Sequence, residues 1–249
     1  MKAFLIPLIV LLSVLPSVAD FAALVKSGDA CDEKFQCDQA LQYYLPAEKL
    51  EPNNAALLVK ISRQYALRMN DLPKESDKIA SCRQGLAYAE RAVAAAPNEC
   101  DPHLSVAICL GRLVPYLGGK EKIETSRRIK ASADRAVRLD PKNDYAWHLL
   151  GRWHQSLANI GGTTRVLASI IYDGLPAASN EEAVACFKKA AALNPKRLVH
   201  VVELGRTYQM MGRKDEARRY LEMGLAMPNR EKDDADTKQR GRASLKQIS

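Results

Sequence analysis

The stretch Tyr145-Ala-Trp-His-Leu-Leu-Gly-Arg-Trp-His154 decides the fold predicted for this chain. Trp147, Leu150, Gly151 and His154 stand at positions i, i+3, i+4 and i+7, which lie on one face of an α-helix. The glycine on that face is small enough for a second helix to approach closely. The stretch therefore predicts a helix that packs against another helix.

Copies of this stretch recur along the chain. The triplet Leu-Gly-Arg ends at Arg112, Arg152 and Arg206, and a weaker copy, Ile-Ser-Arg, ends at Arg63. Apolar segments with small residues at the expected spacing alternate with these copies, and four of the segments are closed by a proline. Paired helices recurring in this way are the pattern of the tetratricopeptide repeat. The closing prolines are Pro52, Pro97, Pro141 and Pro195.

The repeats predict an all-α solenoid of about five helical pairs that ends in a capping helix. Pro46 departs from the pattern, because it stands inside the second helix of the first unit and predicts a bend or a late start there. The expected units span residues 20–52, 54–97, 101–141, 143–195 and 198–229, with an insertion at 159–179 and the capping helix at 231–248.

The first residues have the pattern of an export signal. Met1-Lys2 is followed by a largely apolar run over residues 3–15 and then by Pro16-Ser-Val-Ala19, a small-x-small ending. We expect cleavage near Ala19 and export to the periplasm or the outside. A retained membrane anchor is the alternative, although the apolar run is shorter than the roughly 20 residues that span a bilayer core.

The charge balance indicates anionic partners. The formal net charge is +8, and loss of Lys2 with the signal segment leaves +7, so the surface attracts negatively charged molecules. Neither a zinc-finger spacing nor an aromatic-basic RNA-binding motif is found, so no nucleic acid partner is expected. Acidic proteins come first among the expected partners, and contact with anionic phospholipid at a membrane surface is the other possibility.

The cysteines permit disulfides in an exported chain without fixing their pattern. Cys31 with Cys37, and Cys82 with Cys100 or Cys109, are the pairs to test. No Cys-x-x-Cys pair occurs, so neither a zinc site nor another cofactor is expected. The sixth cysteine, Cys186, is predicted to be a small buried residue.

The arginines of the repeated triplet are the candidate binding residues. First helices line the concave groove of such a solenoid, and the position after Leu-Gly faces that groove. Four guanidinium groups would then stand about 10 Å apart, one per layer. They either bind a carboxylate or phosphate of a ligand, or pair with acidic residues of the adjacent repeat. The candidates are Arg63, Arg112, Arg152 and Arg206, with Tyr145, His148, Gln155 and Gln209 in the same register.

Little in the sequence indicates catalysis or metal binding. No nucleophile motif occurs, and Gly161-Gly-Thr-Thr164 lacks the lysine of a phosphate-binding loop. The histidines show no metal-ligand spacing, so no enzymatic activity is expected. They are His103, His148, His154 and His200.

Four segments carry a resemblance to a known family. They are Ile61-Ser-Arg-Gln64, Leu150-Gly-Arg-Trp153, the segment ending Asp173-Gly-Leu-Pro-Ala-Ala-Ser179, and Pro228-x-x-x-Lys-Asp233. The chain resembles the regulator of microtubule dynamics family over about residues 55–246. The resemblance implies an all-helical repeat domain without enzymatic activity. It also implies microtubule binding in eukaryotic members, and organelle tethering with phospholipid binding in the groove of a membrane-anchored relative.

We therefore predict a non-enzymatic scaffold that binds an acidic or carboxylate-bearing protein segment in its concave groove. The alternative is a module that binds or transfers a phospholipid or small anionic ligand. In that case the amphipathic segment Arg165–Tyr172 of the insertion would serve as a lid, although it is also suited to packing on its own solenoid. The oligomeric state stays open.

Overall fold

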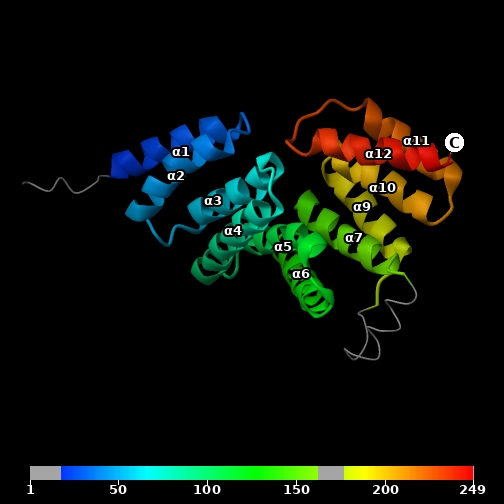
Figure 1. Cartoon of the computed structure of the whole chain (residues 1–249), viewed down its shortest axis with the longest axis horizontal. Coiled ribbons are helices and arrows are strands. Elements are labelled where there is room, and N and C mark those ends of the chain that lie inside the picture. The colour runs from blue at the N-terminus through cyan, green and yellow to red at the C-terminus, as the bar shows by residue number, and fades with distance from the viewer. Residues whose placement is uncertain (1–17, 162–176, 249) are drawn as a thin grey trace, which may run out of the picture.

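The computed structural model describes residues 18–161 and 177–248 (Figure 1). The expected signal segment up to residue 17 and the amphipathic segment Arg165–Tyr172 lie outside this part of the chain. Among the helices that are described, none is both long and apolar enough to cross a bilayer.

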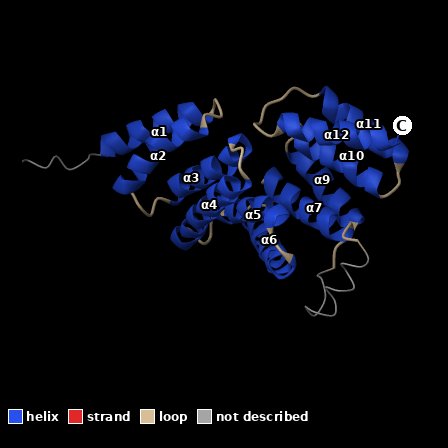
Figure 2. Cartoon of the chain, in the orientation of Figure 1, coloured by secondary structure: helices blue, strands red, loops and turns tan. Residues whose placement is uncertain are grey.

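The described residues form helices and loops without a strand (Figure 2). Two short 3-10 turns, η1 (Met69–Asp71) and η2 (Val114–Tyr116), follow the third and fifth helices. The α-helices are α1 (Val18–Asp32), α2 (Cys37–Leu50), α3 (Ala55–Arg68), α4 (Glu75–Ala95), α5 (Cys100–Leu113), α6 (Gly119–Leu139), α7 (Asp144–Ala158), α9 (Asn180–Leu193), α10 (Leu198–Met210), α11 (Lys214–Ala226) and α12 (Asp234–Ile248).

Consecutive helices pack as antiparallel pairs, and the pairs follow one another along the molecule (Figure 1). The pairs are α1 with α2, α3 with α4, α5 with α6, α7 with α9, and α10 with α11. The last helix, α12, packs against both α10 and α11. The predicted all-α solenoid of five helical pairs with a capping helix is confirmed.

Local sequence signals start several of these helices. Asn54 accepts a hydrogen bond from the backbone N–H of Leu57 at 3.0 Å, and Asn143 accepts from Tyr145 and Ala146 at the same distance. Such side-chain caps satisfy backbone donors that a helix start leaves unpaired. Pro46 does not end its helix, because α2 continues to Leu50.

The core is built from small residues on the second helices and larger ones that pack between them. Tyr44 and Phe187 are fully buried, and each lies in the cluster of its own end of the solenoid. Small side chains let the two helices of a pair approach closely, as in close-packed interiors generally. The second-helix alanines without exposed surface are Ala40, Ala47, Ala89, Ala92, Ala133, Ala136, Ala183, Ala190 and Ala217.

All six cysteines are free thiols in the structure. The Cys82 thiol lies 3.2 Å from the carbonyl oxygen of Cys109, and the Cys109 sulfur lies 3.5 Å from the Ser62 hydroxyl. These contacts join the first helices of two repeats to the second helix between them. Cys82 and Cys109 therefore take part in repeat packing as small buried side chains, as Cys37 and Cys186 are also buried, whereas Cys31 and Cys100 are half-buried.

The glycine of the repeated triplet is required by packing in the last two repeats but not in the third. A Cβ atom at Gly205 would lie 2.8 Å from the backbone nitrogen of Leu221, and one at Gly151 would lie 2.9 Å from the Phe187 ring. A Cβ atom at Gly111 would meet nothing within 4 Å. The glycine of the triplet thus marks a close contact between the two helices of a pair in the fourth and fifth repeats, but not in the third.

We predict opposite effects for Gly205→Ala and Gly111→Ala on the free energy of unfolding. The first should lose about 1–3 kcal/mol, because overpacking forces backbone and side-chain shifts. The second should gain up to about 1 kcal/mol, because alanine favours a helix interior over glycine. Urea unfolding followed by circular dichroism measures both, and equal losses would contradict the packing argument.

Candidate binding groove

Each of the four predicted groove arginines contacts a carboxylate of the chain itself. Arg63 of α3 pairs with Asp32 at the end of α1. Arg112 of α5 pairs with Asp233, which lies on the segment before α12. Asp32 and Asp233 are remote in sequence from Arg63 and Arg112, so these two pairs also tie repeats together.

Arg152 and Arg206 share one buried carboxylate, Glu203 of α10. Their Nη1 atoms lie 2.7 Å and 2.8 Å from its carboxylate oxygens, and Arg240 of α12 lies 3.7 Å away. Glu203 itself has no exposed surface. Burial alone would raise the pKa of Glu203, but the three guanidinium groups outweigh it and lower this pKa to about 2. This cluster holds α7, α10 and α12 together.

The segment 228–233, which we call the strap, connects α11 to α12 and lies over the groove. Asp233 contacts both Arg112 and Asn70, and the Arg112 Nη1 atom donates to the Asn70 amide oxygen at 3.2 Å. Lys232 contacts Asp71 and lies 3.4 Å from the carbonyl oxygen of Phe35. The strap thus bridges the last repeat to the first, second and third repeats.

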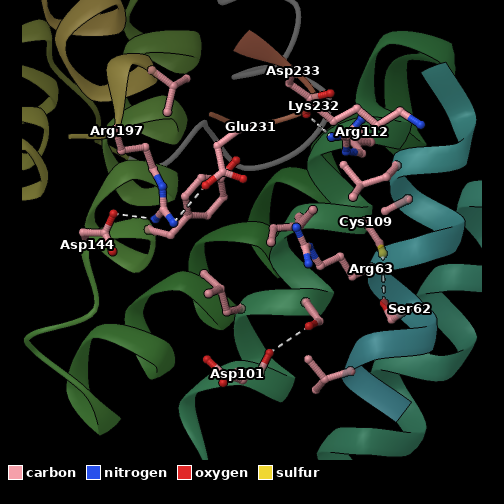
Figure 3. Close-up of a pocket in the computed structure, with 18 of the residues that line it drawn as sticks. Ser62, Arg63, Asp101, Cys109, Arg112, Asp144, Arg197, Glu231, Lys232 and Asp233 are labelled. Carbon is pink, nitrogen blue, oxygen red and sulfur yellow. Dashed lines mark hydrogen bonds and ion pairs between the residues drawn. The ribbon is translucent and has the colours of Figure 1, made fainter. Parts of the chain in front are cut away.

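The other acidic residue of the strap, Glu231, contacts the opposite wall of the groove. Its carboxylate lies 3.3 Å from Arg197, at the start of α10. Figure 3 shows Glu231, Lys232 and Asp233 along one side of the pocket, with Arg197 and Arg112 at separate points of its wall. The strap therefore crosses the groove from the α10 side to the α5 side.

A cavity of about 470 Å³ lies beneath the strap, between α3, α5, α7 and α12. Its wall combines arginines with apolar side chains, which is typical of ligand sites of this size. The cations of the wall are Arg63, Arg112, Arg197 and Lys232, the carboxylates are Asp101, Asp144, Glu231, Asp233 and Asp234, and the apolar residues include Val59, Leu104, Ile108 and Val199.

A buried chain of hydrogen bonds runs from the cavity into the α7–α10 contact. Asp144 accepts from Arg197 at 2.5 Å and lies 2.7 Å from the His200 Nε2 atom. The His200 Nδ1 atom lies 3.0 Å from the Nδ1 atom of His148. Because His200 directs its Nε2–H to the carboxylate, a neutral His200 accepts from the Nδ1–H of His148. Both histidines can therefore be neutral, with a single proton, that of His148 Nδ1, between the two Nδ1 atoms.

Comparison with known proteins identifies the family. The sequence model described as "Regulator of microtubule dynamics protein 1-3" matches residues 24–249. The chain belongs to the regulator of microtubule dynamics family. It is 25% identical over 201 residues to regulator of microtubule dynamics protein 3 of Xenopus laevis, and 28% identical over 195 residues to protein 1 of Bos taurus. These matches cover 80% and 77% of this chain but 43% and 61% of the relatives, so the chain spans about half of their length.

The structural comparison agrees with this family's repeat fold. A thermophilic tetratricopeptide-repeat protein from Thermus thermophilus matches with a TM-score of 0.67, over 90% of this chain and 98% of that protein. Its sequence identity is 17%, so the likeness concerns the fold alone. In this member of the family the fold is therefore a tetratricopeptide-repeat scaffold.

The structure divides the eight predicted groove residues of this family member into separate environments. Arg63, Arg112 and Tyr145 line the cavity, whereas Arg152 and Arg206 form the Glu203 cluster. His148 and Gln155 are only 4% and 2% exposed, within the α7–α10 contact. Gln209 donates to Gln247 of α12 at 3.1 Å. The helix positions predicted to face the groove thus include residues of the cavity wall and residues of the neighbouring α7–α10 contact.

Sequence reasoning missed the acidic half of the groove. Asp144 stands in the first turn of α7, where a carboxylate also suits a helix start, so its position carries no distinct signal. The strap residues belong to the motif Pro228-x-x-x-Lys-Asp233, whose spacing indicates the family but not a contact. Within the described residues no group of His, Cys, Asp or Glu is arranged to hold a metal ion.

We predict that stability falls as the pH is lowered from about 6.5. The pKa of His148 is far below its usual value because of burial and the neighbouring His200, and burial also lowers that of His200. The unfolded chain therefore binds protons below about pH 6.5 that the folded chain does not. Each histidine that stays neutral should contribute a loss of about 1.4 kcal/mol per pH unit.

Urea unfolding at pH 7.5, 6.5 and 5.5 measures this dependence. His148→Phe should reduce the slope below pH 6.5, because it removes a buried imidazole that stays neutral in the folded chain. A wild-type stability that is flat over this range would contradict the assignment. Loss of the Glu203 contribution belongs to a separate window, from about pH 4.5 down to its lowered pKa of about 2.

Glu203→Gln should destabilise the fold strongly. The amide keeps the shape but leaves Arg152 and Arg206 without their counter-charge, and such a loss in a buried pair typically costs about 3–5 kcal/mol. Glu216→Gln is the matched control, since it breaks the exposed pair with Arg213 and should leave the unfolding midpoint near that of the wild type. Equal midpoints for the two variants would contradict the role of Glu203.

Proposed function

We propose that this chain is a non-enzymatic scaffold that binds an acidic segment of a partner protein in the cavity beneath the strap. The observation that carries the proposal is the strap itself. A carboxylate-bearing segment of the same chain already lies against Arg112, Asn70 and Arg197. A groove that accommodates its own acidic segment has the chemistry to accommodate another.

Arg112 and Asn70 form a matched carboxylate site. A guanidinium group and an amide N–H each donate to one carboxylate, and donors of this kind recognise carboxylates by charge and by geometry. The Arg112 side chain keeps 21% of its surface exposed while it is paired with Asp233. Tyr145 and the apolar wall add contact surface beside these donors.

The relatives extend the proposal to a process. The proteins that match this chain are named regulators of microtubule dynamics. We therefore propose that the partner is a protein that takes part in microtubule dynamics. The proposed export signal at residues 1–19 is independent of the groove, and N-terminal sequencing of the mature protein tests it.

A phospholipid or small anionic ligand is the second candidate for the same cavity. Apolar side chains on α3 and α5 lie beside three arginines there, which suits a molecule with an anionic and an apolar part. Native mass spectrometry of the purified chain separates the two candidates. A carrier retains a ligand of constant mass, whereas a scaffold is free of ligand.

We predict that a fluorescently labelled Asp/Glu-rich peptide binds the chain and that Arg112→Ala weakens its binding about tenfold or more, because a hydrogen bond to a charged group is lost. Arg112→Lys should recover only part of the affinity, since lysine lacks the planar fork. Fluorescence anisotropy measures the dissociation constants.

The matched control is Arg213→Ala, which removes an exposed arginine that pairs with Glu216 outside the cavity. It should leave the peptide affinity unchanged. An Asn/Gln counterpart of the peptide should bind much more weakly. If the Arg112 and Arg213 variants lose affinity equally, the peptide binds through overall charge and the groove proposal is wrong.

A further inference from the structure

We infer that the strap is an intramolecular ligand of the groove, and that a partner segment binds by displacing it with the same acid–base–acid pattern. This inference rests on the proposed function and adds the form of the partner and the route of its binding. The pattern is that of Glu231, Lys232 and Asp233, three consecutive residues of alternating charge.

Each of these three side chains meets a partner of opposite charge on a different element. Glu231 contacts Arg197 before α10, Lys232 contacts Asp71 of η1, and Asp233 contacts Arg112 of α5. The groove therefore presents a charge opposite to that of each of these three strap residues in turn. A partner segment with the sign of each charge reversed, base–acid–base, would place like charges together at each of these points.

Arg112 depends on the strap in a way that the other triplet arginines do not. Arg63, Arg152 and Arg206 pair with carboxylates carried on helices, namely Asp32 and Glu203. Those pairs persist when the strap leaves. The carboxylate of Arg112 belongs to the strap, so displacement leaves this guanidinium group, with the Asn70 amide beside it, available to another carboxylate.

The contacts of the strap are of the kind that a competitor can replace. Residues 228–230 are exposed, and none of residues 228–233 is buried. The side chains of Asp71, Glu231 and Asp233 are 58%, 41% and 32% exposed, whereas those of their cationic partners Lys232, Arg197 and Arg112 are 13%, 23% and 21% exposed. Solvent reaches the carboxylate of each pair and screens it, which weakens the pair. The strap is therefore held by polar contacts at the surface and lacks an apolar anchor.

The helix that follows the strap is anchored independently. Its first residue, Asp234, is 2% exposed, and the Asp234 carboxylate accepts from two backbone N–H groups of the strap, those of Arg230 and Glu231, at 2.7 Å and 2.8 Å. Thr237, Ser244 and Ile248 are buried against the rest of the solenoid. α12 therefore keeps its own buried contacts when the strap side chains leave the groove, and the strap stays tied to α12 through Asp234.

The test uses two variants that weaken the strap without changing the arginine wall. Lys232→Ala removes the contact with Asp71, and Asp233→Asn removes the negative charge from Arg112. Glu222→Gln on the exposed face of α11 is the control with the same charge change as Asp233→Asn. Circular dichroism midpoints establish that all three variants are folded.

The probe is a labelled peptide with the sequence of residues 228–234, Pro-Asn-Arg-Glu-Lys-Asp-Asp, added to the full chain. Each strap variant should bind it about fivefold more tightly than the wild type and the Glu222 control, as expected for loss of one competing exposed ion pair. Hydrogen exchange at residues 229–233 of the wild-type chain should accelerate when the peptide is saturating.

The outcomes separate this inference from the proposed function. Equal affinity for the wild type and the strap variants, with unchanged exchange in the strap, means that peptide and strap bind at different places and overturns displacement alone. Absence of binding to a variant whose strap already exchanges freely overturns both the inference and the groove proposal. A peptide with each charge reversed should bind weakly to every variant, and tight binding of that peptide would overturn the acid–base–acid pattern.

Discussion

Charge compensation across the concave surface is the interaction on which the arrangement of this solenoid depends. The second to fifth repeats each carry an arginine of the repeated triplet on the first helix, and several like charges close together on one surface would repel one another. Asp32, Glu203 and Asp233 remove that repulsion. Because two of them come from helices of a neighbouring repeat and the third from the strap, neutralising the groove also fixes how its walls are placed.

The repeat architecture could be predicted from the sequence because it rests on local patterns. The i, i+3, i+4, i+7 spacing around Gly151 and the closing prolines predict where helices lie. The described helices follow the expected units, except that α1 begins at Val18 and α5 at Cys100, one or two residues before the predicted starts. Helix periodicity also predicts that Arg63 and Arg112 face the groove. These predictions depend only on residues that are close together in the sequence.

Whether those arginines are free or ion-paired could not be predicted, because their partners lie far away in the sequence. Asp233 lies 121 residues from Arg112 along the chain, and nothing in either local sequence encodes their contact. His148 and Gln155 share the groove register, but α10 of the next repeat packs over them and buries them. A register identifies the direction of a side chain, whereas its exposure depends on the neighbouring repeat.

The buried chain from Arg197 through Asp144 to the two histidines links the groove to the helix packing beneath it. Arg197 contacts Glu231 of the strap on one side and Asp144 on the other. A partner that replaces the strap would therefore meet a guanidinium group that the fold already holds in position. A site of this kind needs little rearrangement on binding, which reduces the conformational entropy lost.

The central claim is that the groove is a carboxylate-binding site occupied by the chain's own strap. The most direct measurement is a crystal structure of the chain with the peptide of residues 228–234 bound. The account predicts a peptide carboxylate on Arg112 and Asn70, with the strap moved away and α12 in place. A peptide bound elsewhere, with Asp233 still on Arg112, would contradict it.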